Sequence, residues 1–325
     1  MITYYYIIGN PRCSFHITAK RYISSLRKAG YQVEEADINQ IKPNPYALVY
    51  PLFFLRDDKD VQRFKDVHKY LIGFHSSGTD RFGERWVKLF NNSKIDLLIA
   101  PSEYTKDALV NSGVKTRIEI VPHGISQEFR PLNLTRSSEL RVLTFIWHNP
   151  FEKGADVLIK LAKKFPDISF TVSGNGLIGD IPPNIRIDKT WRNESQLAKF
   201  YNTFDIYLGL QRDGAFELCP LEALACGLIV ISNKVGGVPY LNENNSLLIP
   251  PKGKTLLFEN KVNQDEVGYV ADPDIEGWYD SFNYCIHHIK ELKEKAIQGS
   301  KEIRKSYSLD KIGQRLKSVI SKLAI

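Results

Sequence analysis

Apolar and polar residues alternate in blocks along the whole chain. Short apolar runs are separated by stretches with helical spacing, which is the pattern of parallel sheets whose faces are covered by helices. The pattern predicts six strands in the first part of the chain: TYYYIIG, QVEEADI, YALVYPLFF, KYLIGFH, IDLLIAP and RIEIVP. Between them it predicts helices over Ile17–Lys28, Lys59–His68, Arg81–Phe90 and Ser102–Ser112, the last with Ser102 as N-cap and Gly113 as stop.

The block pattern breaks between His123 and Glu139, where Gly, Pro and Ser replace any apolar period. After this linker the alternation resumes and predicts a second sheet: the strands RVLTFIW, ISFTVSG, NIRID, FDIYLGL, LIVIS and SLLIP, with helices over Lys153–Phe165, Glu194–Asn202 and the segment Gly214–Gly227. The chain ends in amphipathic helix over Asp274–Lys295 and Leu309–Leu323, interrupted near Gly299 and Ser306.

This organisation predicts two doubly wound domains, residues 1–135 and 136–306, with the C-terminal helix 307–325 able to pack back onto the first. Two such domains usually bind their ligand at the carboxyl ends of the strands, in the crevice between them. The length of 325 residues suits two domains better than one core.

Composition narrows the classes of protein. No apolar run reaches the length of a membrane span, and the first apolar run has no basic flank, so a cytoplasmic protein is expected. The cysteines Cys13, Cys219, Cys226 and Cys285 are widely spread without a CxxC pair, which argues against a zinc site or a disulfide framework.

The formal net charge of +7 indicates an anionic ligand: a nucleoside diphosphate, a lipid phosphate, a membrane surface or a nucleic acid. Nucleic acid is disfavoured, because no aromatic residues are interleaved with the basic ones. The acids of RDDKDVQRF complement a helix start, so no essential metal is expected there.

The segment Gly214–Pro239 reads as a loop, a short helix and a buried strand. The backbone N–H groups of Leu218 to Leu221 are expected to form an anion site at the helix start, with Glu222 placed to bind a ribose. The alternative is ordinary capping chemistry, with Pro220 at the first helical position, Glu222 in the first turn and Gly227 at the end of the helix.

A second glycine pattern, Gly174, Gly176 and Gly179, matches GxGxxG after a strand. Pro182 and Pro183 follow so closely that no helix can open over a pyrophosphate. We therefore expect a glycine turn and no nicotinamide nucleotide.

Lys153 stands at a predicted helix start, where its charge opposes the helix dipole unless an anion lies nearby. His148 precedes it, either as a second donor to that anion or as an exposed loop residue. His75 follows the fourth strand and is either structural or part of a site at the carboxyl edge.

Three motifs in order carry a resemblance: IEIVPHGISQEFRP, HNPFEKGADVLI and FELCPLEALACG followed by VISNKVGGVPYL. They resemble the family 4 glycosyltransferases of GT-B fold, two Rossmann-like domains facing a central cleft. Weaker similarity extends over nearly the whole chain, including GFHSSGT and TVSGNG.

The resemblance implies that Lys153 binds the donor diphosphate, together with the backbone around Leu218, Cys219 and Pro220. It also implies that Glu222 binds the ribose hydroxyls and that His75 lies near the transferred sugar.

The chain departs from the family pattern at two places. His148 stands where the family usually has arginine, and Gly214 stands where it has the first of two glutamates eight residues apart. Asp213 or Glu217 could supply the missing carboxylate, and the sequence leaves both open. The loop containing Arg192 is expected near the nucleobase.

The expected function is that of a metal-independent retaining hexosyltransferase, which moves a sugar from a nucleotide diphosphate sugar to a hydroxyl on a glycan or lipid-linked acceptor. The nucleotide sugar is a co-substrate, and no further cofactor is expected. A peripheral membrane contact is compatible with the charge. The alternative is a degenerate GT-B protein that binds a nucleotide sugar or a partner transferase.

Overall fold

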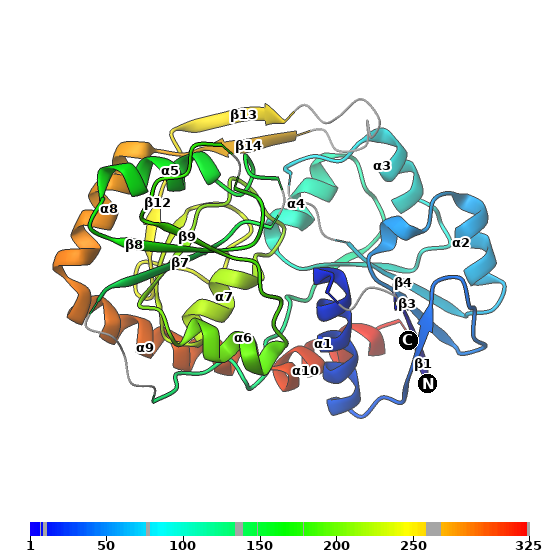
Figure 1. Ribbon diagram of the computed structural model, residues 1–325. Helices are drawn as coiled ribbons and strands as arrows, with labels where there is room; N and C mark the ends of the chain where they lie inside the picture. Colours follow the sequence, from blue (N-terminus) through cyan, green and yellow to red (C-terminus); the bar gives the residue numbers. More distant parts are fainter. Residues whose placement is uncertain are drawn as a thin grey trace. The chain divides into compact units, whose positions relative to one another are not determined.

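A computed structural model describes residues 1–6, 8, 12–75, 79–133, 139–147, 149–177, 179–257 and 268–323. The chain forms two compact units (Figure 1). Unit 1 comprises Met1–Gly124, Leu256–Tyr269 and Tyr307–Ile325, and unit 2 comprises Ile125–Thr255 and Val270–Ser306. The division after Gly124 comes before the boundary at residue 135 that the linker composition suggested.

Unit 1 is built on a sheet of six parallel strands in the order β2-β1-β3-β4-β5-β6. The strands are β1 (Ile2–Tyr6), β2 (Val33–Asp37), β3 (Tyr46–Val49), β4 (Tyr70–Phe74), β5 (Leu97–Ala100) and β6 (Ile118–Ile120). Its helices are α1 (Ser14–Lys28), α2 (Asp58–Lys65), α3 (Glu84–Phe90), α4 (Glu103–Asn111) and α10 (Leu309–Ser321). All six predicted strands are present.

One predicted strand is shorter than its apolar run. The run YALVYPLFF forms β3 only as far as Val49, and Leu52–Phe54 form a short 3-10 helix, η1. Pro51 has no backbone N–H and so cannot continue the ladder of a central strand.

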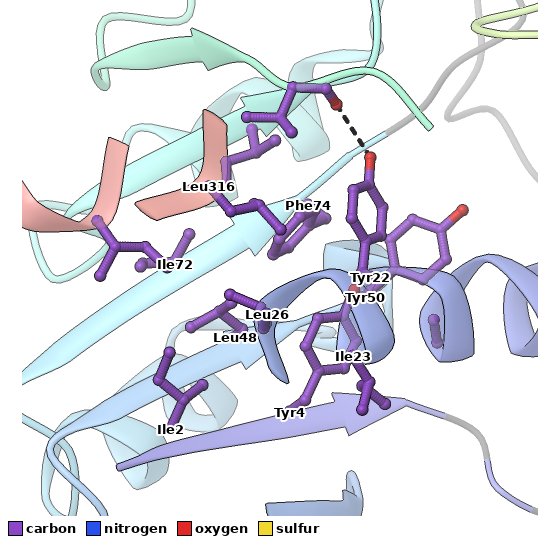
Figure 2. Close-up of a cluster of buried hydrophobic side chains, with 14 of the residues drawn as sticks. Ile2, Tyr4, Tyr22, Ile23, Leu26, Leu48, Tyr50, Ile72, Phe74 and Leu316 are labelled. Carbon is purple, nitrogen blue, oxygen red and sulfur yellow. Dashed lines mark hydrogen bonds between the residues drawn. The ribbon is translucent and has the colours of Figure 1, made fainter. Parts of the chain in front are cut away.

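The core of unit 1 lies on both faces of its sheet. On one face, Tyr4, Tyr22 and Phe74 pack among aliphatic residues (Figure 2). Tyr22 is anchored there because its hydroxyl donates to the carbonyl oxygen of Val121 over 2.9 Å. Leu316 of α10 is fully buried in the same cluster, so the C-terminal helix completes the core of unit 1.

Unit 2 has a second parallel sheet, in the order β12-β11-β10-β7-β8-β9. Its strands are β7 (Arg141–Phe145), β8 (Ser169–Ser173), β9 (Ile185–Asp188), β10 (Ile206–Gly209), β11 (Ile229–Asn233) and β12 (Leu247–Ile249). Its helices are α5 (Ala155–Lys164), α6 (Glu194–Tyr201), α7 (Leu218–Ala225), α8 (Ile275–His287) and α9 (Ile289–Ser306).

The strand order of unit 2 reverses next to β7. From β7 the chain proceeds to β8 and β9 on one side and then returns to β10, β11 and β12 on the other. The loops that leave β7 and β10 therefore diverge at a topological switch point, which is where open parallel sheets bind ligands.

The glycine turn after β8 confirms the interpretation of Gly174 and Gly176. Gly174 has φ +140°, and a Cβ there would lie 2.1 Å from the carbonyl oxygen of Ile146. The N–H of Gly176 donates to that same oxygen over 2.8 Å. Among the described residues between β8 and β9 there is no helix.

Two features of the second half differ from the sequence prediction. A two-stranded sheet, β13 (Gly253–Leu257) with β14 (Gly268–Asp272), was not predicted. The C-terminal helices break at His288 and not near Gly299, which lies inside α9, while the predicted break near Ser306 is confirmed. A Cβ on Gly299 would lie 2.6 Å from that of Asn245, so this glycine allows close packing and does not end a helix.

Candidate donor site in unit 2

The sequence-predicted residues of unit 2 gather at the carboxyl edge of its sheet. Lys153 lies in the loop after β7, and Asp213 to Glu217 lie in the loop after β10. These are the two loops of the topological switch point. The backbone of Gly154 presses against the end of β10, because a Cβ there would lie 2.4 Å from the Leu210 carbonyl oxygen.

An ion pair joins these loops. The Lys153 Nζ donates to Glu217 Oε1 over 3.1 Å, and the side chains are 25% and 18% exposed. Burial alone would lower the pKa of Lys153, but the charges of Glu217 and Asp213 outweigh it and raise the pKa above its usual value. The site thus holds one permanently charged ammonium beside two carboxylates.

The start of α5 differs from the prediction. Lys153 precedes the helix, which begins at Ala155, and Gly154 occupies the N-cap position with φ +71°. The N–H of Lys153 donates to the Asn149 carbonyl oxygen over 3.0 Å, so the lysine belongs to a hydrogen-bonded turn. Asn149 itself has φ +47°, a left-handed conformation that Asn tolerates better than most residues.

Gly214 is required by the backbone. It has φ +152°, and a Cβ there would lie 2.5 Å from Glu217 Oε1. A Cβ on Gly237 would lie 2.3 Å from the Gly214 carbonyl oxygen, so the two glycines lie back to back. The Glu217 N–H donates to the Gly237 carbonyl oxygen over 2.8 Å, which fixes this loop. The Glu217 carboxylate therefore fills the space that a side chain at position 214 would need.

Helix α7 begins earlier than expected. Its first residue is Leu218, and Pro220 is third instead of first. Glu217 is the N-cap residue, but its side chain makes no hydrogen bond to the helix and reaches Lys153 instead. Pro220 has no N–H, so the N–H donors at the start of this turn are those of Leu218 and Cys219. Burial and the carboxylates of Glu222 and Glu217 raise the pKa of the Cys219 thiol to about 12.

Glu222 lies in α7 and is 4% exposed. The hydroxyl of Tyr201, at the end of α6, donates to Glu222 Oε2 over 3.1 Å. The ring of Tyr201 packs against Phe129 and Phe145, with centroids 6.1 Å and 5.5 Å away. Tyr201 is therefore rigid, and it fixes one oxygen of the carboxylate.

Arg192 lies after β9, on the same edge of the sheet. Its guanidinium donates to Asp188 Oδ2 over 2.6 Å and stacks on Phe200, 3.6 Å from the ring centroid. Although burial opposes it, the hydrogen bond from Arg192 lowers the pKa of Asp188 to about 2. Arg192 is thus already engaged, while its neighbour Trp191 is 41% exposed.

His75 belongs to unit 1. It follows β4, its backbone N–H donates to the Ile99 carbonyl oxygen over 3.0 Å, and its ring centroid lies 4.9 Å from that of Phe82 and 4.6 Å from that of Phe90. Burial lowers the pKa of His75 to about 3, so the imidazole is neutral at physiological pH. His148 lies outside the described residues.

The structure thus brings together Lys153, Asp213, Gly214, Glu217 and the first turn of α7. One residue of this edge was missed by the sequence analysis: Arg212, which precedes Asp213 and is 4% exposed. Its place directly before Asp213 was the available signal, and it does not reveal which groups the arginine contacts. In the part of the chain that is described, no three or more His, Cys, Asp or Glu residues are grouped to hold a metal ion.

Comparison with known proteins gives a family match in a range that covers most of unit 2. Residues 133–266 match the family described as "Glycosyl transferases group 1", a range that includes Lys153, Arg192 and Glu222. Uncharacterized protein 356 of Sulfolobus islandicus rod-shaped virus 1 is 26% identical over 285 residues, covering 77% of this chain and 76% of that protein.

A second relative has a named activity. It is one of the subunits of phosphatidylinositol N-acetylglucosaminyltransferase in Arabidopsis thaliana, 24% identical over 200 residues, which cover 55% of this chain. The match spans 43% of that relative's length.

The fold has close neighbours among solved structures. Sucrose-phosphate synthase from Thermosynechococcus elongatus superposes with a TM-score of 0.73 at 14% identity, covering 99% of this chain and 98% of that one. HepE of Anabaena, solved with UDP and glucose, gives a TM-score of 0.70 at 13% identity, covering 99% of each chain. The fold is therefore GT-B, and the family match supports a glycosyltransferase of group 1.

Proposed function

We propose that the chain is a retaining, metal-independent hexosyltransferase of family 4, which transfers a sugar from a nucleoside diphosphate sugar to a hydroxyl acceptor. The observation that carries the proposal is the charged Lys153 at the switch point of unit 2, beside the start of α7. An ammonium and a helix N-terminus are suited to stabilise a leaving diphosphate.

In this proposal each group of the donor site has one role. Lys153 and the N–H groups of Leu218 and Cys219 bind the diphosphate, and Glu222 binds the ribose. Arg192 and Trp191 border the nucleobase. His75, which is neutral, contacts the sugar as a hydrogen-bonding group and not as a cation. The leaving phosphate accepts the proton of the acceptor hydroxyl, so no protein nucleophile is needed.

We further propose that Glu217, and not Asp213, replaces the missing first glutamate. Support comes from the space around Gly214, since a Cβ there would lie 2.5 Å from Glu217 Oε1. A carboxylate from position 217 therefore reaches the volume that the family fills from position 214. As far as Gly214 is concerned, this substitution also weighs against the degenerate GT-B alternative, which rested on the departures at Gly214 and His148.

The acceptor is proposed as a glycan or a lipid-linked sugar in the cytoplasm, reached at a membrane surface through peripheral contact. The +7 charge and the name of the Arabidopsis relative support this choice. No helix among the described residues is long and apolar enough to cross a membrane.

Radiolabelled UDP-, GDP- and ADP-sugars test the proposal with purified protein and a panel of acceptors that includes phosphatidylinositol. We expect transfer from one of the donors, with the anomeric configuration of the product, read by NMR, unchanged from that of the donor. Nucleotide binding without hydrolysis or transfer across the panel would instead support the degenerate protein, and inversion would exclude the retaining mechanism.

A further inference from the structure

Arg212 is a buried arginine that the proposed chemistry does not use. It lies in the loop after β10, next to Asp213, and is 4% exposed. A buried guanidinium is costly unless it is paired and hydrogen-bonded, so its partners show what it stabilises.

The Arg212 guanidinium binds the first turn of α5. Its two terminal nitrogens donate to the two carboxylate oxygens of Asp156, each over 2.9 Å, which is the bidentate arrangement that fixes geometry as well as charge. Although burial opposes it, this pair lowers the pKa of Asp156. The Asp156 side chain is 45% exposed, so the pair lies at the border of the unit and not in its core.

The same arginine holds the turn that carries Lys153. Its guanidinium also donates to the Phe151 carbonyl oxygen and lies 4.1 Å from the centroid of the Phe151 ring. Its backbone N–H donates to the Glu152 carbonyl oxygen over 2.8 Å. The two peptide groups immediately before Lys153 are thus bound by one residue.

Arg212 is itself held in place through its backbone. The Arg212 carbonyl oxygen accepts the N–H of Ala271, in β14, over 2.9 Å. Arg212 therefore connects the loop after β7, the start of α5, the loop after β10 and β14, and these include both loops that contribute to the Lys153–Glu217 pair.

We infer that Arg212 is a positioning residue: it holds the 149–153 turn so that the Lys153 ammonium stays at the diphosphate position. The inference rests on the proposed function of Lys153. Arg212 acts through Lys153 and not by touching the donor, because its two terminal nitrogens are already bound by Asp156 and Phe151 and its Nε is buried.

The test measures a diphosphate-specific quantity. UDP, GDP and ADP are screened by calorimetry, and the tightest binder is used together with its monophosphate. Arg212→Gln is expected to weaken binding of the diphosphate about tenfold and of the monophosphate less than about threefold, since one charge-assisted contact to the second phosphate is lost. A general loss of structure would weaken both nucleotides alike.

Asp156→Asn separates positioning from simple charge. If only the electrostatic potential at the site matters, removing a negative charge nearby should strengthen diphosphate binding. The positioning role predicts weakening instead, because Arg212 loses its bidentate partner. Asp156 is half-exposed, so this variant also serves if Arg212→Gln fails to fold. Tighter diphosphate binding by Asp156→Asn would overturn the inference.

A double-variant cycle gives the final arm. In a Lys153→Ala background, Arg212→Gln is expected to cause less than about a twofold further loss, because both act on one interaction. Independent, additive losses would overturn the inference.

Lys252→Gln is the control: it removes a cation of unit 2 that pairs with Asp274 at 3.0 Å. If the wild type binds no nucleotide, the proposed function fails; if Lys153→Ala weakens binding but the Arg212 and Asp156 variants do not, only this inference fails.

Discussion

Lys153 and Glu217 form a half-buried ion pair before any ligand is bound. The pair keeps the ammonium charged and oriented, since the carboxylates raise its pKa. A diphosphate brings more negative charge to the same ammonium, so it competes with Glu217 for one cation. If the donor binds as proposed, we expect it to free the Glu217 carboxylate to turn toward the sugar.

Lys153→Ala is the simplest test of this arrangement. Loss of a charge-assisted contact to the diphosphate is expected to weaken nucleoside diphosphate binding about tenfold or more. Lys163→Ala, at the other end of α5, removes the same charge away from the site and should leave affinity unchanged. Calorimetry decides, and equal affinity for both variants would remove Lys153 from the site.

Exchanging glycine and glutamate between positions 214 and 217 tests whether Glu217 replaces the missing first glutamate. Gly214→Glu alone should be nearly inactive, because its Cβ would lie 2.5 Å from Glu217 Oε1 and φ is +152°. Glu217→Gly alone should lower turnover about tenfold to a hundredfold. The double variant should regain part of the turnover over both single variants, because the clash and the loss of the carboxylate cancel while the backbone strain at position 214 stays. If it is no better than the worse single variant, the two positions do not share one carboxylate site. Asp213→Asn, assayed alongside, should retain most turnover.

The residue scale also shows what the sequence could reveal. Lys153 could be proposed as an anion-binding residue, because a lysine at a helix start opposes the dipole. The conformation of Gly214 follows from its neighbours only in the folded loop. The role of Arg212 could not be predicted, because its partners Phe151 and Asp156 are distant in sequence and Arg next to Asp is common on surfaces.

At the scale of elements, glycines decide the positions of turns in unit 2. Gly227, with φ +77°, ends α7, and its carbonyl oxygen accepts Lys293 Nζ over 2.6 Å. Gly299 in contrast continues α9, since its lack of a side chain is used for packing on Asn245. The sequence predicted the helix end at Gly227 and wrongly predicted one near Gly299. A glycine that ends a helix and a glycine that allows close packing look the same in a sequence.

The carboxyl ends of β4 and β6 in unit 1 hold two buried histidines, His75 and His123. Burial, and for His123 also the charge of Arg21, lowers the pKa of each to about 3. The unfolded chain then binds more protons than the folded one between pH 3 and about 6.5, so stability decreases as the pH falls through that range. The limit is about 1.4 kcal/mol per pH unit for each histidine.

Urea unfolding at pH 7.5 and pH 5 measures this loss. The wild type should be less stable at pH 5, and His75→Leu should show a smaller difference between the two pH values, because leucine does not titrate. The change of stability that Asp188 causes occurs at lower pH, since the pKa of this carboxyl is about 2. An unchanged pH dependence in His75→Leu would mean that the imidazole is protonated in the folded chain.

At the scale of the whole molecule, unit 1 is completed by distant parts of the chain. Both six-stranded sheets were predictable, because parallel strands buried on two faces appear as continuous apolar runs. The two-stranded sheet of β13 and β14 was not, because GKTLL and GYVAD contain only short apolar runs. The amphipathic pattern of α10 indicated a buried face but not which unit it covers, and only the fold resolves this.

Leu316→Ala tests this division of the chain. Leu316 is fully buried with Ile72 and Phe74, so truncation should lower the stability of unit 1 by about 2–5 kcal/mol, although residue 316 follows all of unit 2 in sequence. Val157→Ala, in the core-facing side of α5, should destabilise unit 2 instead. Hydrogen exchange followed by peptide resolves the two effects, because protection should fall in the strands of unit 1 for the first variant and of unit 2 for the second. Equal loss of protection in both units from either variant would show that the chain unfolds as one cooperative body.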